Sequence, residues 1–221
     1  MYMTKIYVVR HCEAEGNDKR LFQGSTDCDI TETGKKQLAL LGKRFADIEL
    51  DKIYTSPLIR ARKTALAVKG NRDIPITVNP DLTEVHGGIV EGKPFMETIR
   101  SIPGLAEIWN EHPQDFAPEG GEPMREVYER IWRAVIKAVL ENKDKAVALA
   151  THGGAIRCLN CRLNYGTVER LKDVPWCENT GITLIDFDDG LTPRVEFTND
   201  TSHLPEALLP KHSRMAEVAT K

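Results

Sequence analysis

Four short segments of this 221-residue chain carry side chains that could hold and transfer a phosphoryl group. Arg10 and His11 stand together near the N-terminus, Arg60 and Glu84 lie further along, and His152 precedes two glycines. A guanidinium offers a planar fork of donors for phosphate oxygens. A neutral imidazole can attack phosphorus, and a protonated carboxyl group can give its proton to the leaving oxygen. These residue types predict phosphoryl-transfer chemistry if the fold brings them together.

Two of these segments directly follow apolar runs that are typical of buried strands. Residues 5–9 directly precede Arg10 and His11, and residues 146–150 lead into His152. Open α/β sheets place their ligand sites at the carboxyl ends of parallel strands. We therefore expect both histidines at one edge of a sheet.

The other elements alternate in the way that such a sheet requires. Strands are expected at 52–55 and 76–78, and helices at about 31–48, from Pro57 onward, at about 122–142 and at about 155–163. Residues 182–187 and 194–197 flank Asp188-Asp189-Gly190, which predicts a hairpin. The pattern predicts a three-layer α/β/α sandwich with a mainly parallel central sheet and an antiparallel edge hairpin.

Composition indicates one globular α/β domain over residues 1–221. Hydrophobic residues make up 41% and charged residues 29%, and the net charge of -3 favours neither nucleic acid nor membrane as a partner. No charged and apolar leader is recognisable, so we expect a cytoplasmic protein. Residues 87–123, rich in Gly and Pro, are interpreted as an insertion that covers the site, with helices near 95–102 and 105–111. The tail after about residue 204 is expected to be partly mobile.

The chemical segments, taken in order, resemble the histidine phosphatase superfamily, the phosphoglycerate-mutase-like enzymes. The resemblance runs from about residue 5 to residue 203 and includes these blocks: Arg10-His11-Cys12-Glu13 with Asn17, Gln23-Gly24 with Asp27, Thr31 and Gly34, Ser56 to Ala61 with Thr64-Ala65, Leu82 to Val85, Gly88, Glu91-Gly92, Gly120-Gly121-Glu122, and His152-Gly153-Gly154. Any one block is weak evidence, whereas the ordered set is specific.

The resemblance implies a role for each site residue. His11 would be the nucleophile that becomes phosphorylated, and Glu84 would act first as general acid and then as base. Arg10, Arg60 and His152 would bind the three nonbridging phosphate oxygens. Asn17, Gln23, Gly24 and Gly153 would complete the phosphate-binding set.

Each of these residues also has an ordinary structural explanation. His11 and His152 could be buried histidines, Arg60 could belong to a solvated helix face, and Glu84 could be a surface carboxylate. The rival carboxylates for the acid role are Glu13, Glu15 and Glu91. His86 is interpreted as a possible wall of the pocket.

Cysteines raise two further questions. Cys12 stands where the family usually has Gly, and a thiol beside the nucleophile in an electropositive pocket is expected to form a stabilised, reactive thiolate. The alternative is an inert Cys12 that faces the core. Cys158 and Cys161 have C-x-x-C spacing, but they lie in a predicted helix without a second ligand pair. We expect no metal and no cofactor.

The sequence thus predicts a metal-independent phosphatase that hydrolyses small phosphate monoesters, with a small phosphorylated metabolite as its partner. The alternatives are a phosphoglycerate mutase and a non-catalytic phosphate-binding module. Mutases of the family carry Arg directly after the acidic Glu, whereas this chain has Val85 there. They also have a longer insertion than residues 93–119 of this chain. His86, in contrast, favours the mutase, because mutases have a His at this position. The oligomeric state is left open between monomer and homodimer.

Overall fold

The computed structural model describes residues 3–209, in which a six-stranded sheet has the order β3-β2-β4-β1-β5-β6. The strands are β1 (Thr4–Arg10), β2 (Lys52–Thr55), β3 (Ile76–Val78), β4 (Ala146–Thr151), β5 (Ile182–Phe187) and β6 (Pro193–Asp200). β1, β2, β3 and β4 pair in parallel, whereas β5 is antiparallel to both β1 and β6. The predicted mixed sheet with an antiparallel hairpin at its edge is confirmed.

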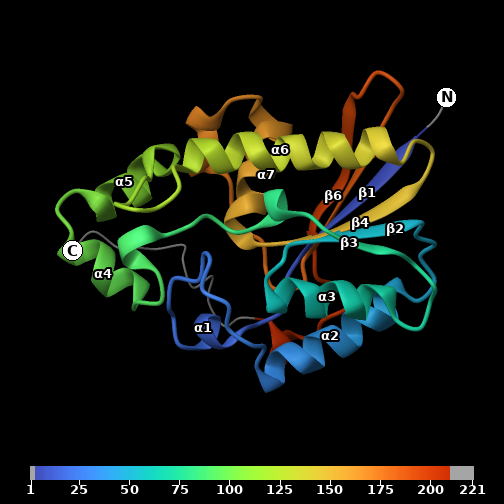
Figure 1. Cartoon of the computed structure of the whole chain (residues 1–221), viewed down its shortest axis with the longest axis horizontal. Helices are drawn as coiled ribbons and strands as arrows, with labels where there is room; N and C mark the ends of the chain where they lie inside the picture. The colour runs from blue at the N-terminus through green and yellow to red at the C-terminus, as the bar shows by residue number, and fades with distance from the viewer. Residues whose placement is uncertain (1–2, 210–221) are drawn as a thin grey trace.

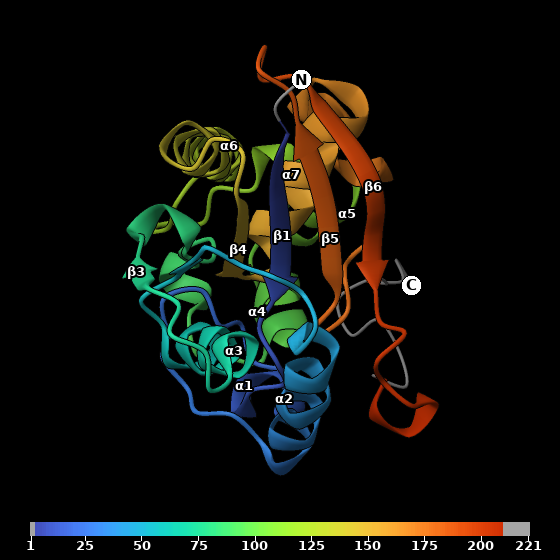
Figure 2. The same ribbon diagram turned by 90° about the vertical axis from the view of Figure 1, so that its right-hand side faces the viewer.

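Helices cover both faces of this sheet (Figure 1). The helices α2 (Glu32–Phe45) and α3 (Ile59–Lys69) lie on one side, and α6 (Met124–Glu141) and α7 (Gly153–Tyr165) lie on the other. Figure 2 shows β1, β5 and β6 side by side between these layers. The three-layer sandwich is therefore the observed architecture.

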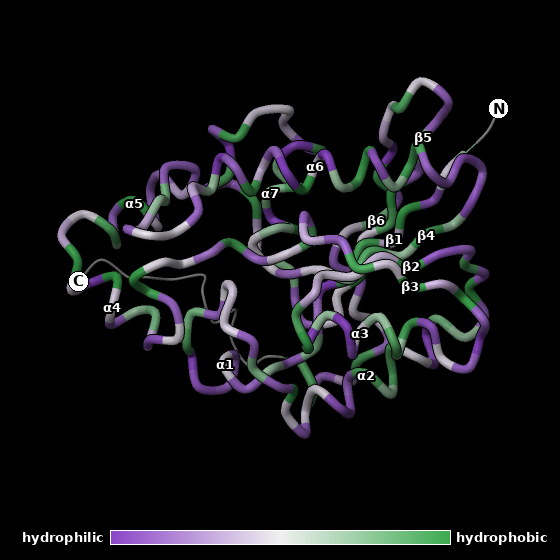
Figure 3. The backbone as a smooth tube through the Cα atoms, in the orientation of Figure 1, coloured by the Kyte–Doolittle hydropathy of each residue, from purple (hydrophilic) through white to green (hydrophobic). Residues whose placement is uncertain are grey.

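The apolar residues explain why the layers form. Val8, Val147 and Leu149 pack with α6 and α7 in one buried cluster, and Val9 and Ile53 pack with α2 and α3 in another. Hydrophobic segments follow the central strands in the hydropathy-coloured tube, while many peripheral turns are hydrophilic (Figure 3). Strands covered on both faces need such near-continuous apolar runs.

The region of the predicted insertion lies beyond the carboxyl ends of the parallel strands (Figure 1). It contains α4 (Phe95–Ser101) and α5 (Leu105–Glu111), close to the expected ranges. The segment expected to be a loop after the first strand contains a short helix, α1 (Glu15–Asp18), in which the Asn17 side chain accepts a hydrogen bond from the Ala14 amide. The predicted tail is described only as far as residue 209, and its remainder lies outside the described residues.

Candidate active site

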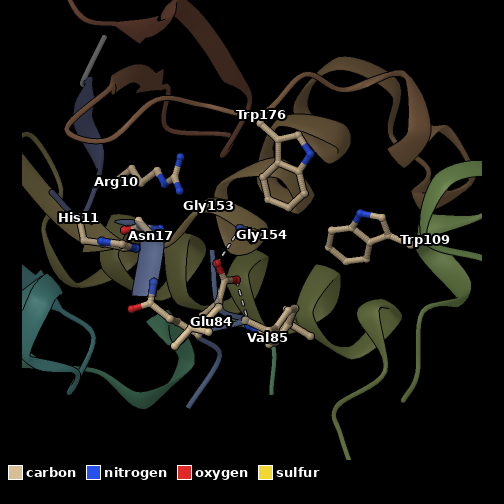
Figure 4. A pocket seen from close by; sticks show the side chains of 12 residues that line it. Arg10, His11, Asn17, Glu84, Val85, Trp109, Gly153, Gly154 and Trp176 are labelled. Carbon is tan, nitrogen blue, oxygen red and sulfur yellow. Dashed lines mark hydrogen bonds between the residues drawn. The ribbon is translucent and has the colours of Figure 1, made fainter. Parts of the chain in front are cut away.

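A pocket opens at the carboxyl ends of β1 and β4 (Figure 4). Its empty space is about 420 Å³, a figure that includes the part open to solvent. Its lining residues are Arg10, His11, Asn17, Leu21, Phe22, Gln23, Glu84, Val85, Trp109, Gly153, Gly154 and Trp176. Of the residues expected to bind phosphate, Arg60, His152 and Gly24 are not part of this lining.

Strand register brings the two site histidines together. Arg10 pairs with Thr151 across the parallel strands β1 and β4, so the next residue on each strand is a histidine. The ring centroids of His11 and His152 are 5.1 Å apart, and both side chains are buried. The apolar runs that predicted the strands therefore also account for the position of the imidazoles.

The His11 ring is fixed in one orientation. Its Nδ1 lies 2.6 Å from the carbonyl oxygen of Cys12, which can only accept, so Nδ1 carries the proton and Nε2 keeps its lone pair. Burial, together with the charges of Arg60 and Arg10, lowers the pKa of His11 well below 6.5. A neutral imidazole with an unprotonated Nε2 is the form that a nucleophile needs.

His152 is held from the neighbouring strand β2. Its Nε2 lies 2.8 Å from the hydroxyl oxygen of Ser56, the residue that follows β2. Burial and the nearby Arg60 lower the pKa of His152 well below its ordinary value. Ser56 was part of the family-like block but was given no role from the sequence, although its position after a strand was a usable signal.

Arg60 lies under the loop that follows α1. Its guanidinium donates to the carbonyl oxygens of Gln23, Gly24 and Thr26 at 2.8–3.0 Å. Arg60 is completely buried, so it is not the solvated helix residue of the ordinary explanation. It holds the loop and contributes positive charge to both imidazoles.

Three buried nitrogens in this group lack a hydrogen-bond partner among residues 3–209: Arg10 Nε, Arg60 Nε and His152 Nδ1. Buried polar atoms are nearly always paired in folded proteins, so each such exception needs an explanation. Arg10 donates through its other arm to the Cys177 carbonyl, and a Cβ added at Gly153 would come within 3.2 Å of Arg10 Nε. The glycine thus allows this guanidinium to lie against the start of α7.

Glu84 is bound by the amino end of α7. Its carboxylate accepts hydrogen bonds from the amides of Gly154 (2.8 Å) and Ala155 (3.2 Å), and from its neighbour Val85 (3.0 Å). A Cβ at Gly154 would lie 2.5 Å from the carboxylate, so this approach requires glycine. Two backbone amides at the start of α7 are therefore bound to Glu84.

Arg130 of α6 secures the segment that carries Glu84. Its guanidinium donates to the carbonyl oxygens of Thr83 and Glu84 and forms a two-point ion pair with Glu122. Thr151 of β4 binds the same segment through the carbonyl of Leu82. Arg130 was missed from the sequence because it lies on the amphipathic helix among charged surface residues.

The three rival carboxylates occupy other positions. Glu91 accepts four backbone hydrogen bonds, from Gly24, Ser25, Thr26 and Gly87, and so closes the loop above Arg60. Glu13 accepts from the Thr31 hydroxyl, and Glu15 is exposed beside Lys19. Among the four carboxylates, only Glu84 lines the pocket.

Sequence reasoning missed two further kinds of residue, one that holds the backbone of His11 and one that lines the pocket. Asn179 donates from Nδ2 to the His11 carbonyl at 2.9 Å, which fixes the backbone of the candidate nucleophile. Trp109 and Trp176 form an aromatic wall on the side of Glu84 away from His11 (Figure 4). His86, expected as a pocket wall, is exposed and is not part of the lining.

The prediction of a reactive thiolate at Cys12 is wrong. The side chain is completely buried, and burial raises the pKa of the thiol to about 12. The backbone amide of Cys12 donates to the Thr64 hydroxyl, and a Cβ at Gly34 would come within 3.4 Å of its sulfur. The thiol therefore packs against helices on the far side of the strand end, as the alternative interpretation held.

Residues 3–209 contain neither a metal-binding cluster nor a membrane-spanning helix. No cluster of three or more His, Cys, Asp or Glu side chains in this part of the chain could hold a metal ion. No helix within it has the length and apolar character needed to cross a bilayer. Cys158 and Cys161 are both buried in α7, where Cys161 Sγ contacts the Thr167 carbonyl.

Comparisons with known proteins identify relatives over most of the chain. The family model described as histidine phosphatase superfamily (branch 1) matches residues 6–201. Phosphoserine phosphatase 1 of Hydrogenobacter thermophilus is 28% identical, with 95% of this chain and 99% of that protein covered. Phosphoglycerate mutase-like protein 4 of Arabidopsis thaliana is 28% identical over 92% of this chain and 88% of that protein. The solved structure of Bacillus stearothermophilus YhfR aligns with a TM-score of 0.85 at 35% identity, covering 90% of this chain and 98% of that chain.

Proposed function

Since the chain belongs to the histidine phosphatase superfamily and is by class a phosphoric monoester hydrolase, we propose that it hydrolyses small phosphate monoesters through a phosphohistidine on His11. The proposed partner is a small phosphorylated metabolite, and the proposed general acid and base is Glu84. The insertion over 87–123 would cover the leaving-group side, because Trp109 of α5 lines the pocket.

The observation that carries this proposal is the set of three unpartnered nitrogens beside His11, on Arg10, Arg60 and His152. A phosphoryl group has three nonbridging oxygens, and each can accept hydrogen bonds from such donors. His152 can donate from Nδ1 while Nε2 accepts from the Ser56 hydroxyl. A phosphoryl group bound beside His11 would offer acceptors to these nitrogens; Arg10 lines the pocket, whereas Arg60 and His152 are buried outside its lining.

The proposed reaction has two displacements at phosphorus. In the first, His11 Nε2 forms a bond to phosphorus, the ester P–O bond breaks, and the leaving oxygen takes the proton of Glu84. In the second, Glu84 takes a proton from water, the water oxygen bonds to phosphorus, and the N–P bond breaks. Inorganic phosphate leaves, and His11 and Glu84 return to their starting forms.

Rapid quenching with a ³²P-labelled ester tests the nucleophile. The wild-type protein should yield a phosphoenzyme that survives base and is lost in acid, as expected for a phosphoramidate. His11→Ala should abolish the label and lower kcat by at least about 10⁴-fold, the scale on which loss of a nucleophile acts. His86→Ala, an exposed histidine, is the control and should retain the label. A base-stable label on His11→Ala would overturn the assignment.

The mutase alternative is supported by the mutase-like name of the Arabidopsis relative. Supplying 3-phosphoglycerate with a 2,3-bisphosphoglycerate primer distinguishes the two reactions. We expect phosphate release to exceed formation of 2-phosphoglycerate. Faster conversion to 2-phosphoglycerate would replace the phosphatase proposal with the mutase.

A further inference from the structure

The pocket has two chemically different ends (Figure 4). Arg10, His11, Asn17 and Gly153 form one end, and Trp109 and Trp176 form the other, with Glu84 between them. Among the lining residues that the structure describes, Arg10 is the only permanent cation, and it lies at the end of His11. The end with the tryptophans therefore offers no described cation to a second anionic group.

Trp109 is a rigid part of the second end. Its ring is buried, with only 4% of the residue exposed, and packs edge-on against Phe95 and Phe116 at centroid distances of 4.7 and 4.8 Å. Phe22, another lining residue, contacts both phenylalanines. An aromatic cluster held by edge-to-face contacts presents an apolar surface without having to rearrange.

Trp176 is held from the opposite side. Its ring stacks on Trp109 at 5.8 Å and 26°, and the Arg157 guanidinium lies 4.9 Å from its centroid. Arg157 is buried and donates to the carbonyls of Val174 and Lys172, so its charge faces this loop and not the pocket. Trp176 is only partly buried and is part of the pocket lining.

Glu84 connects these ends to the chemistry. A general acid must reach the oxygen of the leaving group, and that oxygen lies between phosphorus and the rest of the alcohol. With phosphorus beside His11 and the acid in the middle, the rest of the alcohol extends toward Trp109 and Trp176. An uncharged ring gains by transfer from water to this wall, whereas a carboxylate there would lose hydration without gaining a cation.

We propose that the substrates of this protein are phosphate monoesters of uncharged, ring-bearing alcohols, selected by the aromatic wall of Trp109 and Trp176. This inference rests on the proposed phosphatase function and specifies the substrate class of the same pocket. It separates this chain from the Hydrogenobacter relative, which is named a phosphoserine phosphatase.

Two primary alkyl esters provide the test: 2-phenylethyl phosphate and O-phosphoserine. Both release a primary alcohol, so their difference reports the group that meets the wall. We expect kcat/KM to be at least about tenfold higher for the phenylethyl ester, because burial of one aromatic ring has an effect of this size or more. The difference should appear mainly in KM.

Variants at Trp176 assign the preference to the wall. Trp176→Ala should reduce the ratio of the two kcat/KM values about tenfold, and Trp176→Phe, which keeps an apolar ring, should restore most of it. Tyr165→Ala removes an exposed aromatic outside the pocket and should leave the ratio unchanged. Circular dichroism establishes that each variant is folded.

The outcomes separate this inference from the proposed function. Turnover of both esters with no preference for the ring, or with a preference that Trp176→Ala leaves unchanged, overturns the inference and leaves the phosphatase intact. Absence of turnover of any monoester by the folded wild-type protein overturns both. A preference for O-phosphoserine overturns the proposed substrate class alone.

Discussion

The two ends of the pocket are built from different parts of the fold. The end of His11 and Arg10 lies where β1 and β4 leave the sheet, so its geometry follows from strand register. The end of Trp109 and Trp176 lies on α5 and on the segment after a short 3-10 turn, and packing among aromatic rings holds it. One end is fixed by backbone hydrogen bonds of the central sheet, and the other by side chains of its periphery.

This difference divides the proposed chemistry from the proposed selectivity. Groups that must lie within a few tenths of an ångström of a reacting atom are best placed on rigid elements. Connecting segments tolerate sequence change more readily, and recognition is often located there. Substitutions at the sheet end should therefore lower turnover of every ester, whereas substitutions at the aromatic end should change the order of preference.

Among the substitutions that test the difference between the two ends, Glu84→Gln should have the largest effect on turnover. We expect kcat for 2-phenylethyl phosphate to fall about 10²–10⁴-fold, the usual contribution of acid–base catalysis. Turnover of 4-nitrophenyl phosphate should fall much less, because nitrophenolate leaves without a proton. Steady-state kinetics on the two esters measure the ratio. Equal losses on both would contradict the role of Glu84 as acid.

Acid should affect the sheet end only at low pH. The pKa values of His11 and His152 lie well below 6.5 because of burial first and neighbouring charges second. Both rings are therefore neutral at pH 6.5. As the pH falls below 6.5, the unfolded chain binds protons at these histidines before the folded protein does. The free energy of unfolding that the two neutral rings contribute therefore declines below that pH. NMR titration of the imidazole C–H resonances should show no midpoint near 6.5 for either ring. An ordinary midpoint for His11 would contradict the described burial.

Glu91→Gln should act on stability rather than on leaving-group dependence. Burial acts to raise the pKa of Glu91, but hydrogen bonds from Gly87, Thr26 and Ser25 outweigh it and the pKa is lowered from 4.5. The loss of charged acceptors should cost about 1–3 kcal/mol in the free energy of unfolding. Because the folded pKa is depressed, the stabilisation is present above pH 4.5 and is lost as the pH falls through the lower, folded value.

Urea unfolding of Glu91→Gln at neutral pH and at acidic pH measures this effect. The variant should differ from wild type at neutral pH and converge with it in acid. Its remaining activity should show the same ratio between alkyl and aryl esters as wild type. A changed ratio would mean that Glu91, and not only Glu84, takes part in proton transfer.

Alkylation of Cys12 should have the smallest effect, because the reaction should not occur in the folded protein. A thiol with a pKa of about 12 is almost entirely protonated at neutral pH, and this one is buried. Iodoacetamide followed by peptide mass spectrometry should leave Cys12 unmodified while the partly exposed Cys28 serves as a positive control. Modification of Cys12 with loss of activity would restore the reactive-thiol hypothesis.

Sequence reasoning was most successful where local pattern and chemistry coincide. β-Branched and apolar runs predicted β1 and β4, and the histidines at their ends then had a determined location. It failed where a residue acts through distant partners. Trp176 and Asn179 belong to no periodic pattern, and the depth of Cys12 depends on Gly34 and Thr64, which come from other elements. The role of Arg130 was invisible for the same reason, since its acceptors lie about fifty residues upstream in the segment 81–84.

Helix α7 bears on how such a protein could change over evolution. Its first turn binds the carboxylate of Glu84, and Arg157, further along the same helix, supports Trp176. Glu84 and Trp176, to which we assign proton transfer and selectivity, are thus both held by the same helix. On these proposed roles, mutations in α5 or around Trp176 would change the accepted alcohol without moving Glu84.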